Sequence, residues 1–133
     1  MRYVAFIHKS TDSDYGVSFP DFPGCISAGS TVDEAVVNAG EALSGHVAMM
    51  VADGEEIPSP RSLDAILADP ELVEEREGAS FVHVPLIRDR GSSVRVNISI
   101  DAGLLEAIDQ TAKARGMTRS GFIASAVRHE IAA

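Results

Sequence analysis

Near its end, the chain alternates between apolar and polar residues with a period of two. Four apolar residues of segment 94–100 alternate with three polar ones: Val94, Val96, Ile98 and Ile100 with Arg95, Asn97 and Ser99. This period is typical of a β-strand with one apolar and one polar face. We therefore predict a strand over residues 94–100.

Two helices are predicted after this strand. Asp101 and Thr118 stand at N-cap positions, and Gly116 suits the position just past the end of the first helix. Apolar residues then recur at helical spacing. Those of the first helix are Leu104, Leu105, Ile108 and Ala112, and those of the second are Phe122, Ile123, Ala126, Val127 and Ile131.

A unit of about forty residues buries too little apolar surface to be stable alone. Its strand also lacks a hairpin partner, because the turn-forming sequence R-D-R-G-S-S precedes it. An unpaired strand with an apolar face favours pairing with a second copy. We therefore predict a twofold dimer in which two strands form an antiparallel ribbon and four helices cover its apolar face. The predicted dimer core is Val94, Val96, Ile98, Ile100, Leu104, Ile108, Phe122, Ile123 and Val127.

The opposite face of this ribbon presents Arg95, Asn97 and Ser99 from both copies. A two-stranded ribbon fits the major groove of DNA, where arginine contacts guanine, asparagine contacts adenine, and serine contacts either base. We expect these residues to contact bases. The alternative is an ordinary edge strand with solvated polar residues, and the strand-helix-helix order argues against it.

The tail resembles the ribbon-helix-helix family of bacterial repressors. The polar strand residues, the helix start at Asp101 and the sequence G-M-T-R-S before the second helix match. In that family the N-terminus of the second helix holds a DNA phosphate, as its free N–H groups and positive dipole end favour. The resemblance implies that Thr118, Arg119 and Ser120 bind phosphate.

Residues 1–87 have the pattern of a separate α+β body. Strands are predicted over residues 2–8, 15–19, 25–28 and 80–86. A long helix begins after Thr31, which stands in capping-box spacing with Glu34, and ends at Gly54. Gly40 and Gly45 within this helix suggest close packing against the sheet. A short helix is predicted over residues 62–68, a loosely ordered acidic segment over 71–78, and a linker over 88–93 that separates the body from the tail at 94–133.

Charge is distributed unevenly between these two parts. The net charge is -9, but residues 1–87 hold 4 Lys and Arg against 15 Asp and Glu, and residues 88–133 hold 7 against 5. The slightly positive tail can lie on phosphates, whereas the acidic body repels DNA and attracts a basic protein. Cys25 is the only cysteine, which excludes an internal disulfide and fits the cytoplasm. Neither a signal peptide nor a membrane span is predicted.

The whole chain resembles HicB-type antitoxins. The resemblance rests on Y-V-A-F-I-H near the start, on the run D-Y-G-V-S-F-P-D-F-P-G-C-I-S-A-G-S-T-V-D-E-A-V-V-N-A-G-E-A-L, and on the DNA-binding tail. It implies a truncated ribonuclease-H-like body that binds and inhibits a HicA-type toxin, an mRNA-cleaving protein with a double-stranded-RNA-binding fold. It also implies repression of the antitoxin's own operon. Some members have a helix-turn-helix instead, and the strand over 94–100 places this chain in the ribbon-helix-helix branch.

Enzymatic and metal chemistry were weighed as alternatives. A metal-dependent nuclease would need convergent carboxylates, but Asp12, Asp14, Asp21 and Glu34 have the sequence contexts of turns and a helix cap. His8, His46, His83 and His129 lack metal-site spacing, and Cys25 is expected to be structural. We therefore expect no catalytic residue, metal or cofactor.

The acidic body is the remaining functional surface. Carboxylates are expected to meet a basic toxin and speed its association: Asp12, Asp14, Asp21, Glu55 and Glu56. The predicted function is an antitoxin that inhibits a HicA-type toxin and represses its operon as a dimer, or as a tetramer if the bodies also associate. The competing interpretation is an orphan ribbon-helix-helix regulator whose acidic body senses something else.

Overall fold

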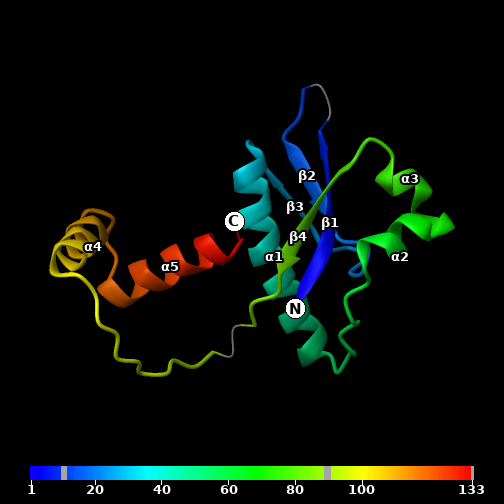
Figure 1. The fold of residues 1–133 in the computed structure, drawn as a ribbon. Coiled ribbons are helices and arrows are strands. Elements are labelled where there is room, and N and C mark those ends of the chain that lie inside the picture. The colour runs from blue at the N-terminus through cyan, green and yellow to red at the C-terminus, as the bar shows by residue number, and fades with distance from the viewer. Residues whose placement is uncertain (10–11, 89–90, 133) are drawn as a thin grey trace. The chain divides into compact units, whose positions relative to one another are not determined.

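A four-stranded antiparallel sheet organises the first part of the chain, in the order β3-β2-β1-β4 (Figure 1). The computed structural model describes residues 1–9, 12–88 and 91–132. Contacts divide them into two units, residues 1–90 and residues 91–131. The predicted linker lies partly outside the described residues, since 89 and 90 are among those left out.

β1 (Arg2–Lys9) is the central strand of the sheet. It pairs on one side with β2 (Tyr15–Ser18), which in turn pairs with β3 (Ile26–Gly29), and on the other side with β4 (Ser80–Pro85). The five residues from Tyr3 to Ile7 are all buried, which explains why β1 lacks strict alternation: both faces of the sheet are covered there. All four predicted body strands are confirmed, with small differences at their ends.

α1 (Val32–Ala52) covers one face of the sheet (Figure 1). Its buried residues pack with Tyr3, Ala5 and Ile7 of β1; they are Ala35, Val36, Ala39, Leu43 and Val47. By length and composition this helix could cross a membrane, but its buried side packs against the sheet. The prediction of close packing is wrong for Gly45, where an added Cβ would meet nothing within 4 Å; at Gly40 it would lie 4.0 Å from Val84.

The N-terminus of α1 shows half of the predicted capping box. The Thr31 hydroxyl accepts a hydrogen bond from the Glu34 N–H at 3.1 Å. The Glu34 carboxylate bonds the backbone N–H and the hydroxyl of Ser30 instead of the Thr31 N–H. These bonds lower the pKa of Glu34.

A helical arm of residues 62–77 lies against the other face of the sheet (Figure 1). It consists of α2 (Leu63–Ala68), the 3₁₀ helix η1 (Pro70–Leu72) and α3 (Val73–Arg76). Ile66 and Leu72 from the arm pack with Val4 and Phe6 of β1. The prediction of a loose segment over 71–78 was therefore wrong, because burying Leu72 orders these residues. The α+β class is confirmed, while the relation to ribonuclease H stays a prediction.

The second unit contains two helices, α4 (Ala102–Ala114) and α5 (Arg119–Ala132), as expected. Asp101 caps α4 by accepting the Leu104 N–H at 3.1 Å, and Thr118 accepts the Gly121 N–H at 3.0 Å. Gly116 has a φ of +67°, the left-handed conformation that glycine adopts most easily. Ile108 and Ala112 are buried.

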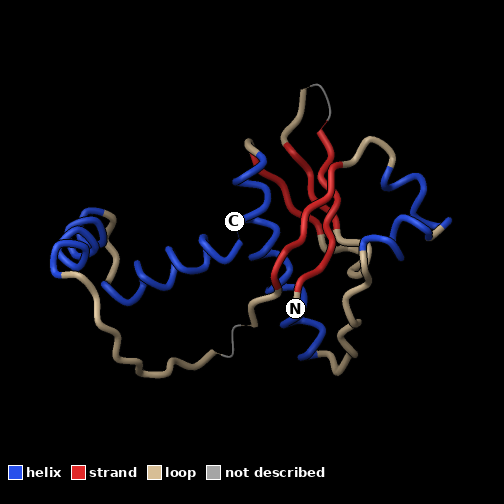
Figure 2. The backbone as a smooth tube through the Cα atoms, in the orientation of Figure 1, coloured by secondary structure: helices blue, strands red, loops and turns tan. Residues whose placement is uncertain are grey.

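The predicted strand over 94–100 is not formed by the single chain (Figure 2). Residues 92–100 have no regular secondary structure. A strand needs a hydrogen-bonded neighbour, and here the chain supplies none. Pairing between two copies stays a prediction.

Candidate functional site

The apolar residues of segment 94–100 are exposed in the single chain. Val94 is 82% exposed and Ile98 is 64% exposed. Six of the nine residues predicted for the dimer core share this exposure: Val94, Val96, Ile98, Ile100, Leu104 and Val127. Of the others, Ile108 is buried, and Phe122 and Ile123 are half-buried. So large a set of exposed apolar side chains is typical of a surface that binds another molecule.

The polar residues of the same segment, Arg95, Asn97 and Ser99, are exposed as well. They alternate with the apolar residues, so an extended backbone would place the two sets on opposite faces. That the polar face contacts DNA stays a prediction.

The predicted phosphate-binding residues Thr118, Arg119 and Ser120 lie together at the N-terminus of α5 and are exposed. The Arg119 guanidinium is held by the Asp109 carboxylate of α4. Nε donates to Oδ1 and Nη2 donates to Oδ2, each at 2.8 Å. These hydrogen bonds lower the pKa of Asp109 and raise that of Arg119. The role of Asp109 could not be predicted from the sequence, since its pairing with Arg119 depends on how α4 and α5 cross.

The structure does not bring the predicted toxin-binding carboxylates together. Asp12 and Asp14 are exposed in the loop that joins β1 and β2. Glu55 and Glu56 are exposed beyond the C-terminus of α1. The segment that follows them passes the start of β1, because the Tyr3 hydroxyl donates to the carbonyl oxygen of Pro58 at 2.7 Å. The two pairs thus lie near opposite ends of β1, roughly 25 Å apart for eight extended residues.

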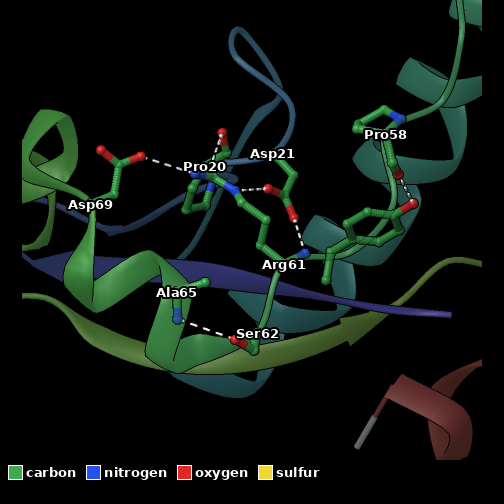
Figure 3. Close-up of polar contacts among 8 residues, drawn as sticks. Pro20, Asp21, Pro58, Arg61, Ser62, Ala65 and Asp69 are labelled. Atoms are coloured by element: carbon green, nitrogen blue, oxygen red, sulfur yellow. Dashed lines mark hydrogen bonds and ion pairs between the residues drawn. The ribbon is translucent and has the colours of Figure 1, made fainter.

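Asp21, the fifth predicted carboxylate, lies inside a network around Arg61 (Figure 3). Its side chain is 3% exposed. Arg61 donates to it from Nε at 2.6 Å and from the backbone N–H at 3.1 Å. Arg61 also reaches Asp69 through Nη1 at 3.0 Å and the Pro20 carbonyl oxygen through Nη2 at 3.3 Å.

This network joins three segments that are distant in sequence. Asp21 belongs to the β2–β3 loop, Arg61 precedes the arm, and Asp69 lies between α2 and η1. Bonds to Asp21 are the main cause of the raised pKa of Arg61. Burial, and secondly the charge of Asp21, raise the pKa of Tyr3. The network has a structural role that could not be predicted from the sequence: it ties the arm to the β2–β3 loop.

The residues weighed for catalysis are separated in the structure. Glu34 bonds Ser30, Asp21 bonds Arg61, and Asp12 and Asp14 lie in the exposed hairpin loop. Within the described residues, no three His, Cys, Asp or Glu side chains are arranged to hold a metal ion. Cys25 is buried, which raises the pKa of its thiol. Burial therefore disfavours the ionised thiolate, which is the reactive form of cysteine.

Comparisons with known proteins agree on one family. A family model described as the HicB-like antitoxin of bacterial toxin–antitoxin systems matches residues 3–127. A 14.9 kDa protein from the rep-hol intergenic region of Haemophilus phage HP1 is 40% identical over 110 residues, which are 83% of this chain and 80% of that protein.

Solved structures are similar over most of the chain. The Burkholderia pseudomallei antitoxin HicB is 35% identical, with 96% of each chain covered and a TM-score of 0.57. The antitoxin HicB3 is 33% identical, with 98% of each chain covered and a TM-score of 0.54. A chain of a HicA3–HicB3 toxin–antitoxin complex is 32% identical, with 65% of this chain and 99% of that chain covered and a TM-score of 0.53.

Proposed function

The chain belongs to the HicB-like antitoxin family, and from this premise we propose that it inhibits a HicA-type toxin and represses its own operon. Inhibition is assigned to residues 1–87. Repression is assigned to a ribbon-helix-helix dimer of residues 94–133 that binds operator DNA.

The observation that supports DNA binding is the exposed alternating segment 94–100. Its apolar residues need cover, which a second copy of the same segment supplies through a twofold antiparallel ribbon. The ribbon then presents two sets of Arg95, Asn97 and Ser99 to the major groove. Thr118, Arg119 and Ser120 bind the flanking phosphates at the N-terminus of α5.

The test of this function is binding of the full chain to DNA from upstream of its gene. Arg95→Ala and Asn97→Ala should each cost about 1–3 kcal/mol and relax the base preference. Fluorescence anisotropy against the operator and a scrambled duplex measures both effects. Arg128→Ala is the control, because it removes one exposed charge from the same unit without touching the ribbon. Operator affinity equal to wild type in the Arg95→Ala/Asn97→Ala double variant would contradict the ribbon assignment.

The Arg119–Asp109 pair gives a second test, on phosphate binding. Arg119→Ala should weaken binding to every sequence. It should also reduce the slope of log affinity against log salt concentration by about one per copy, because one phosphate contact is lost. Asp109→Asn should do the opposite: it frees the guanidinium and removes a negative charge beside the DNA, so affinity should rise for any duplex. Titrations at several salt concentrations measure both slopes. Both side chains are well exposed, so neither change should shift the melting temperature much. A weaker Asp109→Asn variant would mean that the carboxylate orients Arg119 rather than competing for it.

A further inference from the structure

One part of the body's sheet is not covered by either helical layer. The strand register places Ile26, Ser18, Phe6 and Phe81 in one row across the sheet. The arm covers the β1 part of this row, where Phe6 is fully buried with Ile66. At the β3 end, Ile26 is 73% exposed. The surface of β2 and β3 beyond the arm, called the open face below, consists of the exposed Ile26 and Ala28 and the half-buried Gly16 and Ser18.

The open face can be approached closely by a partner. Three of its four side chains are small or absent. A Cβ added at Gly16 would meet only a carbonyl oxygen 3.9 Å away, so space is free above the strand. The outer edge of β3 is less accessible, because the Asn38 side-chain amide donates to the Ala28 carbonyl oxygen at 2.9 Å. A partner therefore meets the face of β3 more readily than its edge.

The surroundings of the open face are acidic. The arm contributes one basic residue, Arg76, and, besides Asp69, which Arg61 binds, five acidic ones: Asp64, Glu71, Glu74, Glu75 and Glu77. Asp12 and Asp14 lie in the exposed loop at the end of β1 and β2. An apolar side chain amid small residues, with a negative rim, complements a positively charged partner.

We propose that the toxin docks on this open face, with the arm and the carboxylates of Asp12 and Asp14 as its acidic rim. The inference rests on the proposed function and specifies where on the body it is carried out. The occupant is a small basic protein, since a protein that cleaves mRNA needs positive charge to hold its substrate. Ile26 is the apolar contact of the interface, and the carboxylates of the rim speed association.

The opposite face of the body provides a matched control. Met49 lies on the outer side of α1 and is 68% exposed, close to the value for Ile26. Lysine at either position introduces a positive charge where the chain is already open to solvent. The body fold should therefore tolerate both changes, and only the change at the docking surface should affect the toxin.

The experiment titrates the full-length chain with the small basic protein encoded beside its gene, by calorimetry. Ile26→Lys should weaken binding about tenfold or more, whereas Met49→Lys should bind as wild type does. Ala28→Lys, on the same open face, should also weaken binding. It replaces Ile26→Lys as the test variant if Ile26→Lys folds poorly. Glu74→Gln/Glu75→Gln should lower the association rate measured by stopped-flow mixing, more so at low salt.

Three results would overturn the inference. Unchanged affinity in both Ile26→Lys and Ala28→Lys excludes the open face. Loss of affinity in Met49→Lys alone assigns the toxin to the outer side of α1. A wild-type chain that fails to bind the basic protein contradicts the toxin half of the proposed function itself, and the DNA measurements above distinguish that failure from a misfolded chain.

Discussion

Ile98→Asp should abolish the tail dimer and, with it, specific DNA binding. The proposed twofold dimer places this side chain twice in its covered apolar face, so the substitution would bury two unpaired carboxylates. Each costs several kcal/mol. Affinity for the operator should fall toward the non-specific level, by roughly a factor of 10³ or more. The folded single chain should survive, because Ile98 is exposed there.

Asn97→Asp is the matched control for this prediction. It places the same carboxylate one residue away, on the face predicted for DNA. This variant should keep the oligomeric state and lose DNA affinity through repulsion of phosphates. Light scattering after size-exclusion chromatography reports the assembly, and anisotropy reports DNA binding. An Ile98→Asp variant that assembles like wild type, or an Asn97→Asp variant that dissociates, would refute the assignment of the two faces.

Arg61→Ala should destabilise the body more than any other single surface change considered above. It leaves the carboxylate of Asp21, 3% exposed, without its main partner. Breaking a buried ion pair costs about 3–5 kcal/mol. Because Arg61 itself is 37% exposed, solvent screening reduces the loss, and we expect about 2–3 kcal/mol. For a domain of this size the melting temperature falls by roughly 10–20 °C.

The geometry of the network allows a stricter test. Arg61→Lys keeps the charge but has no fork with which to bridge Asp21, Asp69 and Pro20 at once, so most of the loss should remain. Arg88→Ala, at an exposed position beyond β4, should change little. Thermal unfolding followed by circular dichroism compares the three variants. If Arg61→Ala melts within a few degrees of wild type, the network is a surface contact that does not stabilise the fold.

Loss of Arg61 should also disturb the proposed docking surface, because Asp69 begins the second half of the arm. Toxin binding would then weaken without any change at the open face. Ile26→Lys separates the two effects, since it should lower toxin affinity at an unchanged melting temperature.

Much of the fold could be predicted because its signals are local. The period of two in strands, the apolar spacing in α1, and the caps Thr31, Asp101 and Gly116 each involve residues within a few positions of one another. Such patterns reflect backbone geometry, and they located every strand of the body and both tail helices. The second half of the arm was the exception: the acidic residues of 71–78 suggested solvation, and only the packing of Leu72 with Phe6 and Val4 ordered them.

The sequence by itself determined the strands of the body, the helices α1, α2, α4 and α5, the uneven charge, and the alternation of apolar and polar residues in the tail. Only the tertiary structure decided which carboxylates are free to bind a partner and which are buried or paired. It buried Asp21 beneath Arg61, forty residues away, paired Asp109 with Arg119, and separated Asp12 and Asp14 from Glu55 and Glu56. It also left β2 and β3 uncovered beside an acidic arm. The reason is physical: periodicity follows from neighbouring residues, whereas burial and pairing depend on which distant segments pack together.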